Sequence, residues 1–219
     1  MPRKSTLAPL AATPPGAEAA RPRGRPRRSA EHEQETRRRI SEVASRLFAE
    51  EGFEAVSMRR LAQEAGCGTM SLYGYFPSKN AILRSLWEDC FAELFPRIQA
   101  ASRRGTPRQR LERAATAFVD YWCTQPQHYR LVFLNQDQRS GEERYYVESP
   151  AVIERFALFR ELIAQLQAAG QGRAGEPQLL SEALICALIG LCHALITIPE
   201  FQWQPRAALI AASLGIVLG

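Results

Sequence analysis

The chain has 219 residues, 46% of them hydrophobic, and a formal net charge of +5. This length suits one medium domain or a small domain joined to a larger one, and it can bury a substantial core. No apolar run approaches the roughly 18 to 20 residues of a membrane span. The most apolar stretch, residues 183–198, contains His193 and small residues and ends at Pro199, which predicts a buried helix and no membrane contact.

The first 30 residues carry most of the positive charge. They hold seven Arg or Lys and one acid, a net +6, whereas residues 31–219 hold 21 basic and 22 acidic residues, a net −1. The segment is rich in Pro, Ala, Gly and Arg, so it cannot bury enough surface to offset its ordering entropy, and we expect a disordered tail. A transit peptide is an alternative that rests on composition alone, and the apolar run 7–12 is too short for a signal peptide.

Apolar residues recur with helical spacing from residue 33 onward. The first helix has one apolar face and closes at Gly52, as glycine often does just past a last turn. Ser57 caps a short second helix that ends at Gly66, and a third short helix runs from Thr69 until Pro77 stops it. The apolar face of the first helix consists of Ile40, Val43, Ala44, Leu47 and Phe48.

Serine and proline residues mark the start of the later helices. Residues 135–148 are polar and predict a loop, residues 170–175 a linker. We find no alternating strand pattern and no repeat, so we expect an all-α fold of about nine helices. The later helices are expected to begin at Ser78, Pro107, Pro126, Ser149–Pro150, Pro177 and near Pro205, the last two reaching about Thr197 and Leu218.

Residues 57–76 have the packing pattern of a helix-turn-helix. Two short helices joined by a tight turn cross steeply, so the residue at their approach must be small, as Ala62 is. The turn needs a residue that tolerates positive φ, which Gly66 supplies. A helical hairpin without a DNA role is the alternative, but it gives no packing reason for the hydroxyl and aromatic side chains that the third helix projects outward.

This segment resembles the N-terminal domain of TetR/AcrR-type transcriptional regulators. The matching features are LFAEEGF, a Ser before M-R-x-L-A, AG in the turn, S-L-Y-x-Y-F and then P-S-K, over about residues 36–85. The resemblance implies a sequence-specific regulator, a repressor released from a palindromic operator by a small molecule, with activation as a variant. It also implies a tail (1–30), a helix-turn-helix DNA-binding domain (31–80) and a helical ligand-binding and dimerisation domain (81–219).

The resemblance assigns DNA contacts that the chemistry of the side chains supports. Hydroxyls and an ammonium donate to phosphate oxygens, and Arg59 is the candidate for a guanine edge because Arg pairs with it bidentately. Met70 begins the recognition helix and is a candidate for a thymine methyl. Gly68 and Gly74 depart from the family pattern, so the operator sequence cannot be transferred. The expected phosphate or base contacts are Ser57, Thr69, Ser71, Tyr73, Tyr75 and Lys79.

The tail contains RPRGRPRR at residues 21–28. Its centre, with Arg23 and Arg25 around Gly24, resembles the AT-hook, a peptide that lies in the minor groove of A·T-rich DNA. Glycine allows close approach to the groove floor, proline keeps the chain extended, and arginine follows the narrow negative groove. A generic basic arm that only neutralises phosphates is the alternative.

The last two helices are the expected dimer interface. Residues 183–196 are apolar nearly all round, with small Ala187, Gly190 and Ala194, so this helix needs two burial partners, the domain core and a second subunit. The alternative is an internal helix of a monomer. The family resemblance further implies an inducer pocket among aromatic residues, for which ordinary core packing is the alternative. The pocket candidates are Trp87, Phe91, Phe118, Trp122, Phe133, Phe159 and His193, the last more readily explained as a hydrogen-bonded core histidine.

The cysteines and histidines do not indicate an enzyme. Five cysteines, an odd number without CxxC spacing, predict reduced thiols packed in helices and a reducing compartment. We therefore expect a cytoplasmic protein of a bacterium, associated with the nucleoid when it is bound to DNA. We find no nucleophile elbow, phosphate loop or zinc spacing, and we expect no cofactor and no metal. Cys67 is interpreted as a packing residue, with a redox switch as the alternative. An architectural DNA-binding protein that relies on the tail is the remaining alternative.

Overall fold

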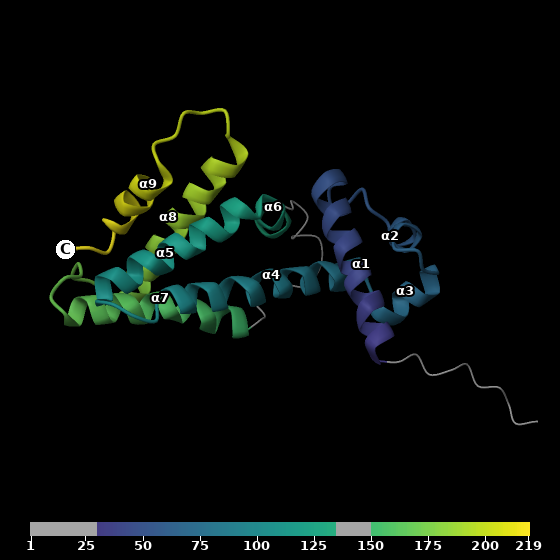
Figure 1. The fold of residues 1–219 in the computed structure, drawn as a ribbon, viewed down its shortest axis with the longest axis horizontal. Coiled ribbons are helices and arrows are strands. Elements are labelled where there is room, and N and C mark those ends of the chain that lie inside the picture. Colours follow the sequence, from purple (N-terminus) through teal and green to yellow (C-terminus); the bar gives the residue numbers. More distant parts are fainter. Residues whose placement is uncertain (1–29, 135–149) are drawn as a thin grey trace, which may run out of the picture.

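The computed structural model describes residues 30–134 and 150–219, and within these ranges the chain is helical without a sheet (Figure 1). The all-α prediction is therefore confirmed. The predicted AT-hook-like tail and the predicted loop 135–148 lie outside the described residues. The helices are α1 (Ala30–Glu51), α2 (Met58–Glu64), α3 (Thr69–Tyr75), α4 (Lys79–Ala101), α5 (Pro107–Thr124), α6 (Pro126–Phe133), α7 (Pro150–Ala168), α8 (Pro177–Thr197) and α9 (Arg206–Leu214).

Helices α1 to α3 form a compact unit at one end of the molecule (Figure 1). The Ser57 hydroxyl accepts a hydrogen bond from the Arg60 amide at 3.2 Å, which confirms it as the cap of α2. Gly66 has φ of +63° in the turn between α2 and α3, as predicted. The unit packs around fully buried Ile40, Leu61 and Leu72. These contacts fix α3 against α1 and α2 by its inner side only.

Helix α4 leaves this unit and runs into the rest of the protein (Figure 1). The Ser78 hydroxyl caps it by accepting from the Ala81 amide at 3.1 Å. The helix continues through Pro96 to Ala101, although proline removes one helical donor. Ile98, fully buried two residues later, anchors the last turn against the core. One continuous helix therefore joins the two ends of the molecule.

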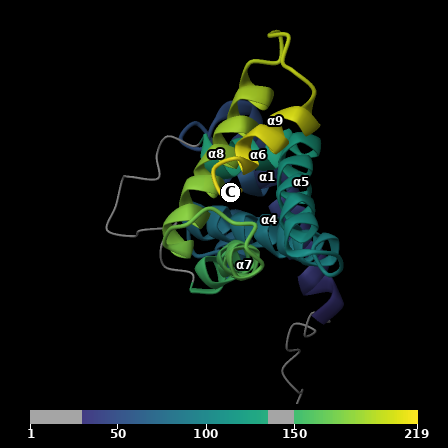
Figure 2. The same cartoon turned by 90° about the vertical axis from the view of Figure 1, so that its left-hand side faces the viewer.

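Helices α4 to α9 form a bundle in which α5 packs against α4, α6, α7, α8 and α9. Figure 2 views this bundle from its left-hand end, with α9 against α8. Thr106 and Gln109 form a capping box around Pro107 at the start of α5. Helix α9 ends at Leu214 rather than at the predicted Leu218. The chain turns at Gly215, and the Arg173 amide donates to the Val217 carbonyl at 2.9 Å, so the last residues pair with the α7–α8 connection.

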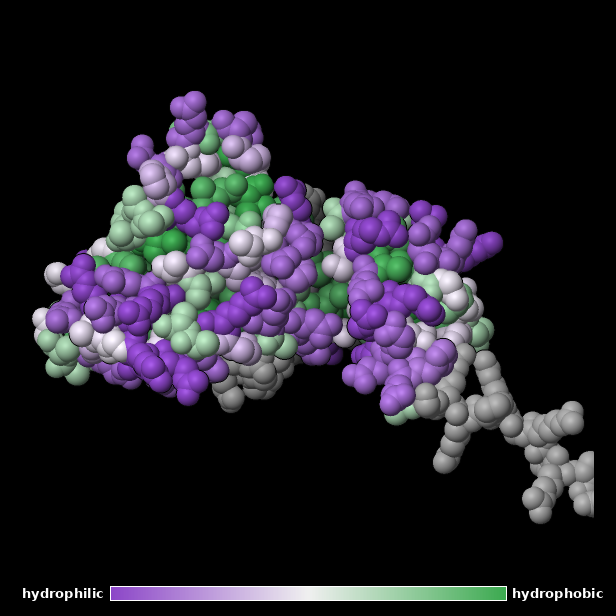
Figure 3. Space-filling model, in the orientation of Figure 1, coloured by the Kyte–Doolittle hydropathy of each residue, from purple (hydrophilic) through white to green (hydrophobic). Residues whose placement is uncertain are grey.

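Helix α8 is buried on one side only. It is long and apolar enough by composition to cross a membrane, but Leu184, Leu188 and Cys192 face the core. The other side is open, and His193 is exposed there, so the interpretation of His193 as a core residue is wrong. The reason is that α5, α7 and α9 cover only the side of α8 that carries its buried residues. Figure 3 shows apolar atoms gathered over α8 and α9 at the surface.

The cysteines are free thiols. Cys67 is half-buried and packs against the core, in agreement with the packing interpretation, whereas Cys186 is exposed on α8, contrary to prediction. Cys123 on α5 and Cys192 on α8 interact directly. The hydrogen bond from Cys192 lowers the pKa of Cys123 to about 7, and the same interaction, with burial, raises the pKa of Cys192.

Candidate nucleic-acid interface and the effector core

The outer side of α3 presents the side chains predicted to read DNA. Met70 is 85% exposed and Tyr73 46% exposed, whereas Leu72 between them is fully buried. Thr69, Ser71 and Tyr75 are half-buried along the same helix. Met70 and Tyr73 are too exposed to contribute to the hydrophobic core. Core packing therefore does not explain why large apolar side chains occupy these two positions. The structure therefore brings these five residues together on one short helix.

Helix α2 places Ser57 and Arg59 next to α3. Both are exposed, and Arg59 forms no ion pair with any described residue. Arg60, its neighbour, is held by Glu64 at 3.2 Å and by Glu51 at 3.8 Å. Of these two arginines only Arg59 keeps its guanidinium available for an external partner, and its contact with a guanine edge stays a prediction.

Lys79 turns toward the protein instead of away from it. Its ammonium donates to the Phe53 carbonyl at 2.7 Å and to the Glu54 carbonyl at 3.4 Å, and it lies 4.2 Å from the centre of the Phe53 ring. An ammonium has three donors, so at most one remains for a phosphate. The structure thus gives Lys79 a role in tying the α1–α2 connection to α4, and its phosphate contact remains a prediction.

Arg37 of α1 is a residue that the sequence did not single out. Its guanidinium donates to the Tyr75 carbonyl at 3.2 Å and lies 4.3 Å from the centre of the Phe76 ring. It reaches the C-terminal end of α3 from a helix 38 positions earlier in the chain. No local pattern signals such a contact, because it depends on how α1 and α3 cross.

A family model described as "Bacterial regulatory proteins, tetR family" matches residues 40–86. This range contains α2, α3 and part of α1. Residues 40–86 are therefore a DNA-binding domain of the tetR type. The match covers α2 and α3 and stops within α4, so it does not include α5 to α9.

Known proteins resemble a larger part of the chain than this domain. The HTH-type transcriptional activator FasR of Mycolicibacterium smegmatis is 33% identical over 102 residues, 46% of this chain and 47% of FasR. The match thus spans about half the length of that relative. A TetR family transcription regulator from Shewanella sp. PV-4 is 26% identical, with a TM-score of 0.64 over 84% of this chain and 98% of that chain. A SmeT–triclosan complex shares the fold at 18% identity, with a TM-score of 0.69 over 85% and 93% of the two chains.

Most of the predicted pocket aromatics form a packed cluster. Phe91, Phe118 and Phe133 each meet Trp122 edge-to-face, with ring centroids 5.2 to 6.2 Å apart, and Phe159 packs against Phe118 at 6.3 Å. The Trp87 indole N–H donates to the Leu131 carbonyl at 3.1 Å. His193 is exposed, and its ring lies 6.3 Å from that of Tyr129, which in turn packs edge-to-face against Trp122.

Trp122 has an unsatisfied donor inside this cluster. The residue is fully buried, and its indole N–H is the one buried side-chain polar atom without a partner among the described residues. A buried donor left unpaired costs about 1 to 3 kcal/mol. Buried polar groups normally have a hydrogen-bond partner, and the described part of the protein supplies no acceptor for this N–H.

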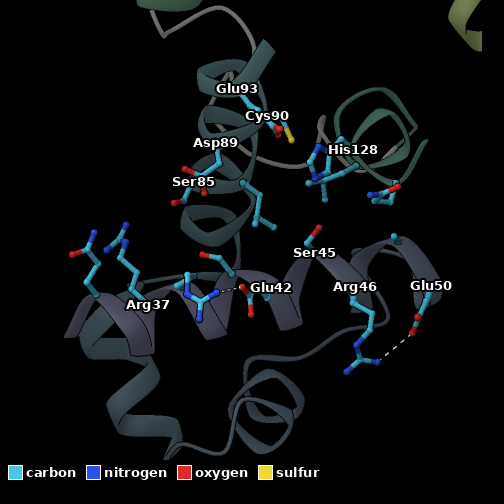
Figure 4. Close-up of a pocket in the computed structure, with 17 residues that line it drawn as sticks. Arg37, Glu42, Ser45, Arg46, Glu50, Ser85, Asp89, Cys90, Glu93 and His128 are labelled. Carbon is cyan, nitrogen blue, oxygen red and sulfur yellow. Dashed lines mark hydrogen bonds and ion pairs between the residues drawn. The ribbon is translucent and has the colours of Figure 1, made fainter. Parts of the chain in front are cut away.

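A separate hollow of about 770 Å³ lies where α1 meets α4 and α6 (Figure 4). Ser45 of α1, Cys90 of α4 and His128 of α6 face it. The His128 ring nitrogen lies 3.0 Å from the Tyr121 hydroxyl, and burial lowers the His128 pKa. Partial burial and neighbouring Glu88 raise the pKa of Asp89 at the rim, which the charge of Arg37 opposes. In the described ranges no group of three His, Cys, Asp or Glu residues could hold a metal ion.

Proposed function

We propose that this protein is a dimeric transcription regulator that reads a palindromic operator with α3 and is released from it by a small molecule. The observation that carries the proposal is the exposed row of Met70 and Tyr73 on a recognition helix whose inner residue, Leu72, is fully buried. An enzyme is set aside because the matched relatives are named as transcription regulators. Reduced thiols support a cytoplasmic location.

Each DNA contact is proposed from the position of its side chain. The hydroxyls of Thr69, Ser71, Tyr73 and Tyr75 on α3 donate hydrogen bonds to phosphate oxygens, and that of Ser57 does so from the start of α2. Met70 contacts a thymine methyl, and Arg59 a guanine edge. Footprinting of the DNA beside the gene tests this proposal. It predicts two protected half-sites with dyad symmetry, their centres about 34 to 36 Å apart or a multiple of that.

The direction of regulation follows from a transcription assay on the same DNA. A repressor lowers transcription when it binds, and the small molecule restores it. Activation is the second candidate, because FasR, the relative matched over about half its length, is named an activator. Transcription that rises on binding would decide for the second candidate.

We propose the division of the chain at about residue 80, with α1 to α3 binding DNA and α4 to α9 binding ligand and partner. Continuous α4 joins the two parts, so a change in its tilt alters the spacing of the two recognition helices. The open apolar side of α8, together with α9, supports a two-fold dimer interface.

The tail is proposed as a minor-groove contact beside α3. Changing both Arg23 and Arg25 to lysine keeps the charge but removes the planar guanidinium. If the tail lies in the groove, this variant loses affinity for operators with A·T-rich flanks and keeps it for G·C-rich flanks. Fluorescence anisotropy on the two DNAs measures the difference. Equal affinities on both flanks would instead support the generic basic arm.

Deleting residues 1–28 removes the positive charge of the tail, which the lysine variant keeps. Comparing the two variants therefore isolates the effect of this charge. Each phosphate that the tail no longer neutralises reduces the slope of log affinity against log salt by about 0.9. The lysine variant should leave this slope unchanged, whereas the deletion should reduce it. Retained dyad-symmetric footprints after deletion would exclude an architectural protein that relies on the tail.

The effector is proposed to be an apolar compound with an oxygen that accepts from the Trp122 indole N–H. Triclosan, the ligand of the SmeT complex, is the probe. Trp122→Phe keeps an aromatic ring but removes the donor, so the concentration that releases operator DNA should rise about fivefold, the worth of one hydrogen bond. Anisotropy of labelled operator DNA during triclosan titration measures it. Trp203→Phe, whose indole N–H donates to Ile198 instead, should behave as wild type.

A further inference from the structure

The recognition helix α3 has few stabilising features of its own. It has seven residues, contains Gly74, and its first cap, Gly68, supplies no side-chain hydrogen bond. It carries no basic residue in its last turn. Short helices with an internal glycine are marginal, and glycine costs about 1 kcal/mol relative to alanine. The helix that reads DNA therefore depends on neighbours for its order.

Arg37 supplies the missing interaction at the C-terminal end of α3. The last carbonyls of a helix have no helical partner and carry the negative end of its dipole. The Arg37 guanidinium donates to one of them, that of Tyr75, at 3.2 Å. The same group lies 4.3 Å from the centre of the Phe76 ring, the residue that ends α3. Both contacts hold the end of the helix from α1.

Arg37 also faces α4. It lines the same hollow as Ser85 and Asp89 of α4, and Figure 4 shows Arg37 and Asp89 on the two helices that border it. A second, smaller hollow joins Arg37 to Ser71, Gly74 and Tyr75 of α3. The charge of Arg37 interacts with that of Asp89. One guanidinium thus bonds the end of the recognition helix and lines the same hollow as an acid of α4.

We propose that Arg37 is a positioning residue that caps the recognition helix and, through Asp89, makes its order depend on the position of α4. The attraction of Asp89 pulls the guanidinium away from the Tyr75 carbonyl. A movement of α4 that brings Asp89 closer weakens the cap, and one that withdraws it strengthens the cap. This inference rests on the proposed function for its effect on DNA, but the cap itself exists without DNA.

Hydrogen exchange of the α3 amides in the free protein tests the cap. Arg37→Gln should speed exchange of the Leu72 and Phe76 amides about fivefold, because a helix-end charge interaction is worth that factor. Arg37→Lys keeps the charge and should restore part of the protection. Arg39→Gln, an exposed arginine two residues away, should leave α3 unchanged. Unchanged exchange in Arg37→Gln would overturn the cap.

Operator affinity and its salt dependence separate positioning from direct DNA contact. Arg37→Gln should weaken operator binding by up to about fivefold for each of the two subunits, while the salt slope stays as in wild type. A slope reduced by about 0.9 per subunit would show that Arg37 contacts a phosphate, which would overturn the positioning role. If the wild-type protein binds no operator, the proposed function fails, but the exchange experiment still decides the cap.

Asp89→Asn tests the link to α4. Removing the Asp89 charge should slow α3 exchange about twofold, as expected for an exposed charge interaction. In an Arg37→Gln background the same change should have no effect. Unchanged α3 exchange in Asp89→Asn alone would overturn the link.

Discussion

Changing both Thr69 and Tyr73 to alanine should abolish operator-specific binding while the protein stays folded. Each proposed hydrogen bond to a phosphate is worth roughly 1.5 kcal/mol, so two contacts in each of two subunits amount to about 6 kcal/mol at most. Because such contributions are not fully additive, we expect a loss of specific affinity between about 100-fold and 10⁴-fold. The remaining binding should be weak, salt-sensitive and equal for operator and scrambled DNA.

The stability of the double variant decides how that loss is interpreted. Tyr73 is 46% exposed and Thr69 half-buried, and alanine favours the helix more than either. The free energy of unfolding, obtained from thermal unfolding, should therefore change by no more than about 0.5 kcal/mol. Leu72→Ala is the contrasting variant, because it empties a fully buried site and should cost about 2 to 5 kcal/mol. Full specific affinity of the Thr69 and Tyr73 double variant would refute DNA reading by α3.

Local chemistry in the sequence predicted most of the fold. Ser57 and Ser78 cap the helices that they precede, and Gly66 has the positive φ that the turn requires. Each of these features acts within three or four residues, so its signal lies beside its effect. The starts of α5, α6 and α8 at Pro107, Pro126 and Pro177 are predictable for the same reason, because proline fits the first turn of a helix.

The features that the sequence missed depend on contacts between distant residues. Arg37 reaches Tyr75 across 38 positions, and the Lys79 ammonium reaches the Phe53 carbonyl across 26. A basic side chain near a DNA-binding helix can bind either a DNA phosphate or a backbone carbonyl of the protein. Which of the two it reaches depends on how α1, α2 and α4 pack, and the sequence does not show this packing. The prediction of a core position for His193 is wrong for a related reason. The sequence of an apolar helix does not show which of its sides the other helices cover.

Gly190→Glu should dissociate the proposed dimer without harming the subunit. Gly190 is exposed on the open side of α8, and nothing lies within 4 Å of the position that a Cβ would take. Glutamate also favours a helix over glycine, by up to about 1 kcal/mol, so the subunit should keep its thermal stability. In a two-fold interface each subunit would bury an unpaired carboxylate against its partner. Burying an uncompensated charge costs about 3 to 5 kcal/mol, which predicts a dimer dissociation constant at least 100-fold higher.

The effect on DNA binding distinguishes the dimer interface from the recognition helix. A dimer engages two half-sites, and linking two binding events raises affinity by about 10² to 10⁴ without new contacts. Gly190→Glu should lose this factor on the full operator and keep the wild-type affinity for a single half-site, whereas the Thr69 and Tyr73 double variant should lose both. Sedimentation velocity and anisotropy on the two DNAs measure the outcome. Ala164→Glu, on the exposed side of α7, adds the same charge and should remain a dimer. A Gly190→Glu protein that sediments as a dimer would place the interface elsewhere than on α8.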